Sequence, residues 1–209
     1  VEIFKAFEAK IEKGIAKAVE IGEGVVPTYF THEVTDFEPV VDADGNPVMS
    51  HYGLQKAKVK GFKAVPLPAF LEGPARMMGY VDTDTAREMF NNVKKTDIYD
   101  SKLGMYKTSA SIEECSMENG RCRAFTPGWQ ERENVFLHME YKYMLAMIKA
   151  GLYDEFYETV TRALVPFLDP NMYGRSILEN SSFIASSANP NEDIHGRGFV
   201  ARLSGSTTE

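Results

Sequence analysis

Two helical patterns that follow one another almost without a break constrain the fold of this chain most strongly. In ENVFLHMEYKYMLAMIKAG the apolar residues recur at helical spacing and Gly151 provides a stop. YDEFYETVTRALVPFL repeats the pattern and is ended by Pro166 and by Asp169-Pro170. A connection this short favours an antiparallel helix pair, so the sequence predicts a helical hairpin in the second half of the chain.

The first half of the chain combines further helical patterns with one stretch of different character. Helical spacing marks VEIFKAFEAKIEKGIAKAVEIG, PAFLEGPARMMGY and DTDTAREMFNNVKKT, the last with capping residues at 82–85. TYFTHEVTDFEPVV and AKVKGFKAV are instead rich in β-branched and aromatic residues and are joined through the turn signal DADGNP. We therefore expect a mainly α chain with a short β-rich excursion near residues 26–65.

Composition excludes several classes of protein. The chain has 209 residues, 44% of them apolar, and a formal charge of −7, which argues against a broad electrostatic grip on nucleic acid. No apolar run reaches the length of a membrane span and no signal peptide opens the chain, so we expect a cytoplasmic protein. Cys115 and Cys122 have neither metal-type spacing nor a histidine cluster beside them. Two free thiols and no metal are expected, with a disulfide as the open alternative.

The segment FTPGWQERENVFLHMEYKYM places polar residues where a helix begins. Pro127-Gly128 predicts a turn, Glu131 and Glu133 suit a helix N-terminus, and His138 lies on the helix that follows. Taken singly, His138 is typical of a core histidine with one hydrogen bond, and Glu131 of a charge at a helix start.

Two later segments are also unusually polar. YGRSILENSSFIASSANP interrupts an apolar pattern with serine and asparagine. GRGFVA formally matches a dinucleotide fingerprint, but NPNEDI rather than a strand precedes it and no acidic partner follows, so we reject that interpretation. The Ser-Gly-Ser-Thr stretch at 204–207 offers hydroxyls and backbone N–H groups to an anion, or is a solvated end.

Together these segments resemble a known family. PGWQERENVFLH resembles the P-G-x-x-E-x-x-x-x-x-x-H stretch of inverting glycoside phosphorylases of the cellobiose phosphorylase type. GRGFVARLSGS is similar to that family's G-x-G-x-x-x-x-[WY]-T-G-[ST] segment. By this resemblance, His138, Ser204, Gly205 and Ser206 bind phosphate. Glu131 would stand in the active-site wall.

The resemblance also implies where the chain belongs in its enzyme. It makes residues 1–209 the C-terminal portion of an (α/α)6 catalytic barrel, with the remainder of a larger enzyme as partner. Ser204 replaces the family's usual threonine, and Arg202-Leu203 replace an aromatic pair. The Asp-Trp-x-Asp motif that carries the family's general acid is absent from the sequence. We therefore expect no general acid in this chain and no activity from it alone, and leave a homodimer open.

The implied reaction is phosphorolysis of a β-linked gluco-disaccharide or oligosaccharide with inversion. Inorganic phosphate is the co-substrate, a sugar 1-phosphate is the product, and no organic cofactor is needed. Polar and aromatic side chains would meet the sugar, and the candidates are Glu131, Glu179, Trp129 and Tyr173. Two alternatives remain open: a glycoside hydrolase with Glu131 as base, and a non-catalytic carbohydrate-binding or structural helical domain.

Overall fold

The computed structural model describes residues 1–201, which form two units. Residues 29–67 make one unit, and residues 1–28 together with the chain from Pro68 onward make the other. The longer helices of the second unit are α1 (Glu2–Ile21), α3 (Thr83–Lys94), α5 (Leu137–Lys149) and α6 (Tyr153–Ala163). Shorter helical pieces are α2 (Glu72–Met77), η1 (Met78–Tyr80), η2 (Met117–Asn119), α4 (Arg121–Ala124), η3 (Val165–Phe167), α7 (Pro170–Tyr173) and η4 (Glu192–Ile194).

Helix α3 begins and packs as its sequence indicates. The side chain of Asp82 caps it by accepting the N–H groups of Asp84 at 3.1 Å and Thr85 at 3.0 Å. The residues that α3 buries are spaced three or four apart and so lie on one face, and they are Ala86, Met89, Phe90 and Val93. This face joins the main hydrophobic core.

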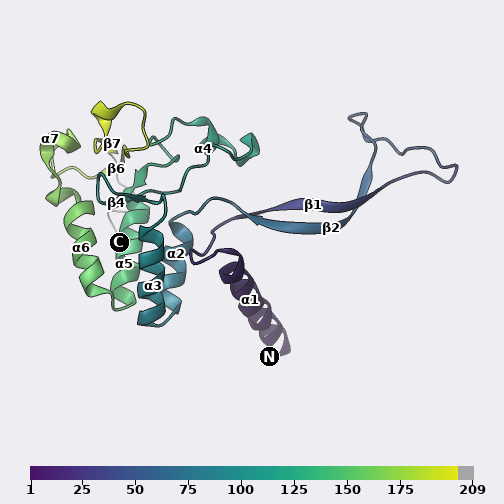
Figure 1. The fold of residues 1–209 in the computed structure, drawn as a ribbon, viewed down its shortest axis with the longest axis horizontal. Helices are drawn as coiled ribbons and strands as arrows, with labels where there is room; N and C mark the ends of the chain where they lie inside the picture. The colour runs from purple at the N-terminus through teal and green to yellow at the C-terminus, as the bar shows by residue number, and fades with distance from the viewer. Residues whose placement is uncertain (202–209) are drawn as a thin grey trace. The chain divides into compact units, whose positions relative to one another are not determined.

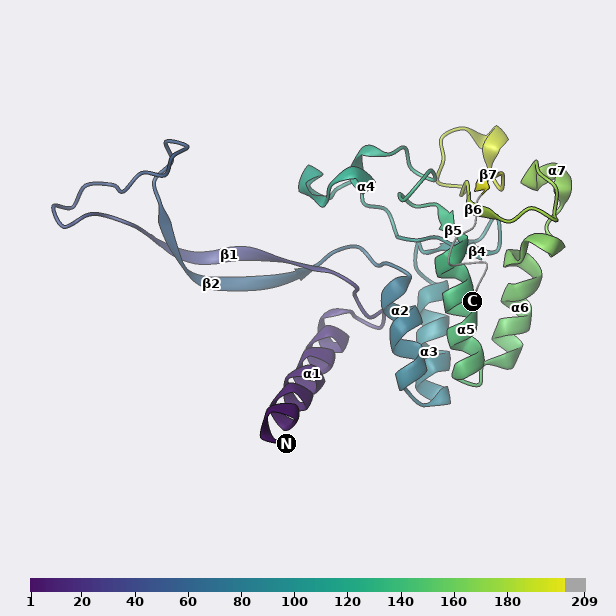
Figure 2. The same cartoon turned by 180° about the vertical axis from the view of Figure 1, so that it is seen from behind.

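Helices α5 and α6 lie side by side, as both views of the ribbon show (Figures 1 and 2). Three residues connect them, and Gly151 among these has a φ of +78°, a backbone conformation that glycine adopts most easily. The main core is formed where α2, α3 and α5 meet, around the buried side chains of Leu71, Met78, Phe90, Val93, Ile98, Tyr106, Tyr143, Met147 and Leu152.

Three small antiparallel sheets accompany these helices in the described residues. One is the pair β3 (Tyr99–Asp100) and β4 (Met105–Tyr106). Another has the order β5 (Val135–Phe136), β6 (Ser181–Ile184) and β7 (Gly198–Ala201). The last belongs to the smaller unit.

The smaller unit is a long hairpin of β1 (Phe30–Pro39) and β2 (Ala57–Pro66). Apolar cross-strand pairs such as Val34 with Phe62 alternate with oppositely charged pairs such as Glu33 with Lys63. The register shifts between Val34 and Phe37, which marks a β-bulge.

The fold class expected from the sequence is wrong. The described residues combine helices with three antiparallel sheets in a mixed α/β fold rather than forming part of an (α/α)6 barrel. The hairpin pattern was clear in the sequence, but the segments around Tyr99, Val135 and Ser181 form strands of only two to four residues. Strands of two to four residues are too short to show an alternating pattern, so no periodicity in the sequence marks them.

Candidate functional site

The sheet β5–β6–β7 is the frame that holds the residues of the candidate site. Central strand β6 is antiparallel to both neighbours, so β5 and β7 run in the same direction. Phe136 pairs with Phe183 at the end of β5, and Ala201 pairs with Ser181 at the end of β7. Both outer strands therefore end toward the same edge of the sheet, the one at which β6 begins with Ser181.

An aromatic row crosses one face of this sheet and links two predicted site residues, Trp129 and His138. Trp129 stacks on Phe199 with ring centroids 3.8 Å apart and planes 8° apart. The row continues through Phe183, at 5.3 Å from Phe199, to Phe136, at 4.8 Å from Phe183. The imidazole of His138 meets Phe136 edge to face at 5.6 Å. One run of packed rings thus fixes both residues.

His138 is half-buried and lies in the first turn of α5, directly after strand β5. A helix N-terminus carries partial positive charge and backbone N–H groups without intrahelical partners, and both favour anions. The imidazole of His138 lies at the same place, with its Nε2 atom buried. The end of β5 therefore combines two features that an anion site uses.

The turn that carries Trp129 and Glu131 is held against the loop after β6. Gly128 has a φ of +71°, and a Cβ built on it would lie only 2.5 Å from the backbone N of Asn189. The backbone N–H of Ser186 donates to the Gly128 carbonyl at 3.2 Å, and the Asn189 side-chain amide donates to the Pro127 carbonyl at 3.0 Å. The close approach requires glycine at 128.

Backbone strain concentrates around the same turn. Gln130, Glu133 and Val200 adopt φ values of 55°, 54° and 56° although none is glycine. For Val200, which is β-branched, this is a genuine outlier. Strained backbone of this kind persists only where the surrounding structure enforces it, and it clusters at functional sites.

Glu131 is held by a two-pronged ion pair. Arg121 donates to its two carboxylate oxygens at 2.8 Å and 2.6 Å, and the Cys122 thiol lies 3.8 Å from one of them. Burial, followed by the nearby Glu131 carboxylate, raises the pKa of Cys122. Arg121 engages both carboxylate oxygens of Glu131, but each oxygen can accept a further hydrogen bond, for example from a sugar hydroxyl.

Tyr173 and Glu179 lie together at the Ser181 edge of the sheet, in different roles. Tyr173 is fully buried, and its hydroxyl lies 2.7 Å from the Glu179 carbonyl and accepts the Ser181 N–H at 2.8 Å. Its ring has no surface left for a sugar, so it serves the core. The exposed carboxylate of Glu179 forms an ion pair with Arg175 at 2.5 Å. Arg175 also donates to the Gly198 carbonyl at 2.9 Å, which ties Glu179 to strand β7.

The charged residues Arg132 and Glu133 were not singled out for roles in the site, yet both are buried. Arg132 donates to the carbonyls of Arg123 at 2.9 Å and Phe125 at 3.0 Å, to the Glu133 carboxylate at 3.3 Å, and to Glu113. The hydrogen bond from Arg132, followed by the charge of Arg123, lowers the pKa of Glu113. Arg132 thereby fixes the loop that leads into Trp129. The sequence offered one signal, the charged triplet at 131–133, which lies just before the short strand β5.

The serine-rich segment after β6 is also fixed by a buried acid that the sequence did not reveal. The carboxylate of Asp100 accepts the Ser187 N–H at 2.7 Å and the Ser187 hydroxyl at 2.8 Å. His195 lies 2.7 Å from the Asn189 carbonyl through Nε2 and 2.8 Å from the Lys102 ammonium through Nδ1. Because an ammonium only donates and a carbonyl only accepts, Nδ1 of His195 accepts from Lys102 and Nε2 donates to Asn189.

The structure thus brings some predicted residues together and leaves others apart. Trp129 and His138 are joined by the aromatic row, and Glu179 lies at the edge where β7 ends. Ser204, Gly205 and Ser206 lie outside the described residues. Within residues 1–201 no group of three or more His, Cys, Asp and Glu side chains is arranged to hold a metal ion.

No model of a known protein family matches the chain, and no curated protein matches it either. Among the helices that the structure describes, none is both long and apolar enough to cross a membrane.

Proposed function

We propose that this chain binds phosphate and sugar in a glycoside phosphorylase, which cleaves a β-glucoside with inorganic phosphate to give a sugar 1-phosphate with inversion. The observation that carries the proposal is the shared edge of the sheet. His138 follows the last residue of β5 by two positions, and Ser204 follows the last residue of β7 by three. Strands β5 and β7 both run toward that edge of the sheet, so His138 and Ser204 follow in sequence from strands that share it.

The chemistry of phosphate binding suits these residue types. Inorganic phosphate is already an anion, so a phosphorylase has to hold it rather than deprotonate it. An imidazole, the hydroxyls of Ser204 and Ser206, and the backbone N–H of Gly205 are all donors, and the first turn of α5 adds the positive end of a helix. We assign phosphate binding to this set.

The sugar would lie along the aromatic row and its flanking carboxylates. Trp129 offers an indole N–H and a ring surface, while Glu131 and Glu179 offer acceptors for sugar hydroxyls. Neither carboxylate is assigned as the general acid, which we place in the remainder of the enzyme. No metal or organic cofactor enters this scheme, and both cysteines being free thiols suits a reducing cytoplasm.

Phosphate affinity tests the proposal without requiring the general acid. Isothermal titration of the 209-residue chain with inorganic phosphate should show binding that His138→Ala weakens about ten- to a hundredfold. His51→Ala removes a histidine from the hairpin unit and should leave the affinity unchanged. If His138→Ala lowers the melting temperature while phosphate affinity stays constant, His138 is a core residue and the assignment fails.

Turnover by the complete gene product separates the alternatives. Incubation with cellobiose or laminaribiose should release a sugar 1-phosphate only when phosphate is present. Release of glucose at the same rate without phosphate would indicate a hydrolase. Oligosaccharide binding with no turnover in either condition would indicate a non-catalytic domain. Either result overturns the proposal.

A further inference from the structure

Helix α1 is amphipathic, yet none of its residues is buried. Its apolar stripe consists of Ile3, Phe4, Phe7, Ile11, Ile15 and Val19. Phe4 is 73% exposed and Phe7 is 57% exposed, although a helix of this pattern normally packs its apolar face against another surface. Within residues 1–201 only the end of the stripe has neighbours, because Val19 lines a small apolar pocket with Met77 and Met89, and the rest of the stripe faces solvent.

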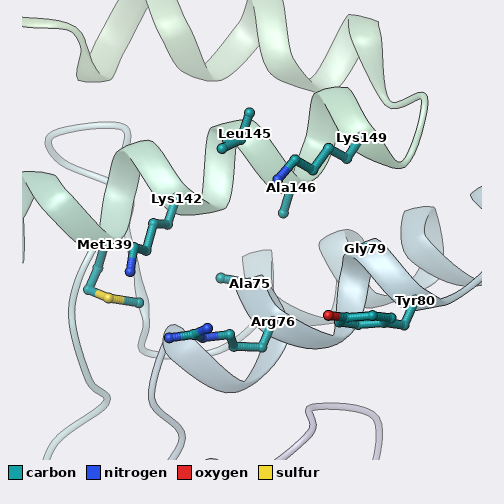
Figure 3. Close-up of a pocket in the computed structure, with 9 residues that line it drawn as sticks. All are labelled: Ala75, Arg76, Gly79, Tyr80, Met139, Lys142, Leu145, Ala146 and Lys149. Atoms are coloured by element: carbon teal, nitrogen blue, oxygen red, sulfur yellow. The ribbon is translucent and has the colours of Figure 1, made fainter. Parts of the chain in front are cut away.

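A groove elsewhere on the same unit is shaped and charged to receive a helix. It runs between α2–η1 and α5 and encloses about 400 Å³ (Figure 3). Small residues line it on both sides, namely Ala75 and Gly79 on one helix and Ala146 on the other. Arg76, Lys142 and Lys149 also line it, and Arg76 forms an ion pair with Glu72 at 3.3 Å. We call this surface the basic groove.

We propose that the apolar stripe of α1 in one copy of the chain lies in the basic groove of a second copy, and reciprocally. Large side chains such as Phe4 and Phe7 fit against small lining residues, which let two helices approach closely. At 3.6 residues per turn, Glu8 and Glu12 fall along one border of the stripe and so face the cations of the groove. Shape and charge both match.

A second copy is the occupant because it satisfies both surfaces at once and closes the assembly. Every copy carries one stripe and one groove, so a twofold axis makes two equal contacts and leaves neither surface open. The stripe spans residues 3–19, which is about 24 Å of helix and roughly 10 Å wide. Two such contacts bury on the order of 1,000 Å² in total, at the lower limit for a specific interface. The dimer is therefore concentration-dependent.

Sedimentation velocity across a concentration series measures this dimer directly. The wild-type chain should pass from monomer to dimer, and Phe7→Glu should raise the dissociation constant roughly tenfold or more. Ala16→Glu makes the same kind of change on the opposite face of α1 and should leave it unchanged. At concentrations where the wild-type chain is a monomer, neither variant should alter the melting temperature, because none of the residues of α1 is buried within a single copy. A monomer at all concentrations, or a dimer that Phe7→Glu leaves intact, overturns the proposal.

Cross-linking then identifies the surfaces. Equal amounts of ¹⁴N- and ¹⁵N-labelled chain are mixed and treated with a carbodiimide, which joins neighbouring carboxylates and amines. Peptides that join Glu8 or Glu12 to Lys149 should combine the two labels. If these peptides carry a single label, the groove holds the helix of its own chain. If no such peptides form in a dimeric sample, another surface makes the dimer. Both results overturn the proposal, and neither bears on phosphate binding.

Discussion

Gly128→Ala is the substitution that most directly tests how the candidate site is held. Gly128 adopts a φ of +71°, and an added Cβ would lie 2.5 Å from the backbone N and 3.0 Å from the Cα of Asn189. The neighbouring atoms are the backbone and the Cβ of Asn189, which cannot move aside as the far end of a flexible side chain does. Relief requires separating the turn at 127–128 from the loop at 186–189.

The expected cost has two parts. An L-residue in the left-handed region costs about 1–2 kcal/mol. Separating the two loops breaks the hydrogen bonds from Ser186 to the Gly128 carbonyl and from Asn189 to the Pro127 carbonyl, each worth about 1 kcal/mol. We expect Gly128→Ala to lower the free energy of unfolding by about 3–4 kcal/mol.

Urea denaturation followed by circular dichroism measures this loss, and Gly151→Ala is the matched control. Gly151 has a similar φ of +78°, but its added Cβ would only touch Thr83 Oγ1 at 3.5 Å, an ordinary contact. The control should therefore lose only the conformational part, about 1–2 kcal/mol. Equal losses for the two variants would refute the argument from close approach.

Three further substitutions test other parts of the molecule. Burial raises the pKa of Glu140 well above its usual range, so the folded state keeps a proton that the unfolded state releases. The stability of the fold is therefore lost as the pH rises from the ordinary pKa of glutamate through the raised pKa of the folded state. Glu140→Gln keeps an acceptor for the Tyr106 N–H and should remove that loss. In denaturation series at increasing pH, the free energy of unfolding of this variant should rise relative to that of the wild type. A difference between the two free energies that stays constant with pH would contradict this. Gly198→Ala would put a Cβ 2.2 Å from the ring of Tyr173, and calorimetry should show a destabilisation of about 1–3 kcal/mol or more. Arg132→Met leaves the buried Glu133 carboxylate without its cation and should cost about 3–5 kcal/mol in chemical denaturation, whereas a loss below about 1 kcal/mol would show that the pair does not hold the loop.

Much of the local structure could be predicted from the sequence. Helices α3, α5 and α6 follow from apolar spacing, from the Asp82 cap and from the stop at Gly151. The strand pair of the hairpin follows from its β-branched and aromatic residues on either side of a turn. In each case the signal lies within about twenty residues, the range over which periodicity and capping operate.

The candidate site depended on contacts that no local pattern records. Strand β5 has two residues, and its partner Ile184 is 49 positions from Val135. The same polar run that indicated a helix start at Glu131 instead buries Arg132, because its partners come from the loop at 113–125.

The sequence by itself determined the helices, their caps and the hairpin, and it supplied the residue types from which a phosphate site is proposed. Only the tertiary structure decided that short strands join the helices in place of a barrel, that Trp129 and His138 share one aromatic row, and that the stripe of α1 stays exposed. The physical reason is that a helix satisfies its backbone within four residues, whereas a strand of two to four residues exists only through its neighbours.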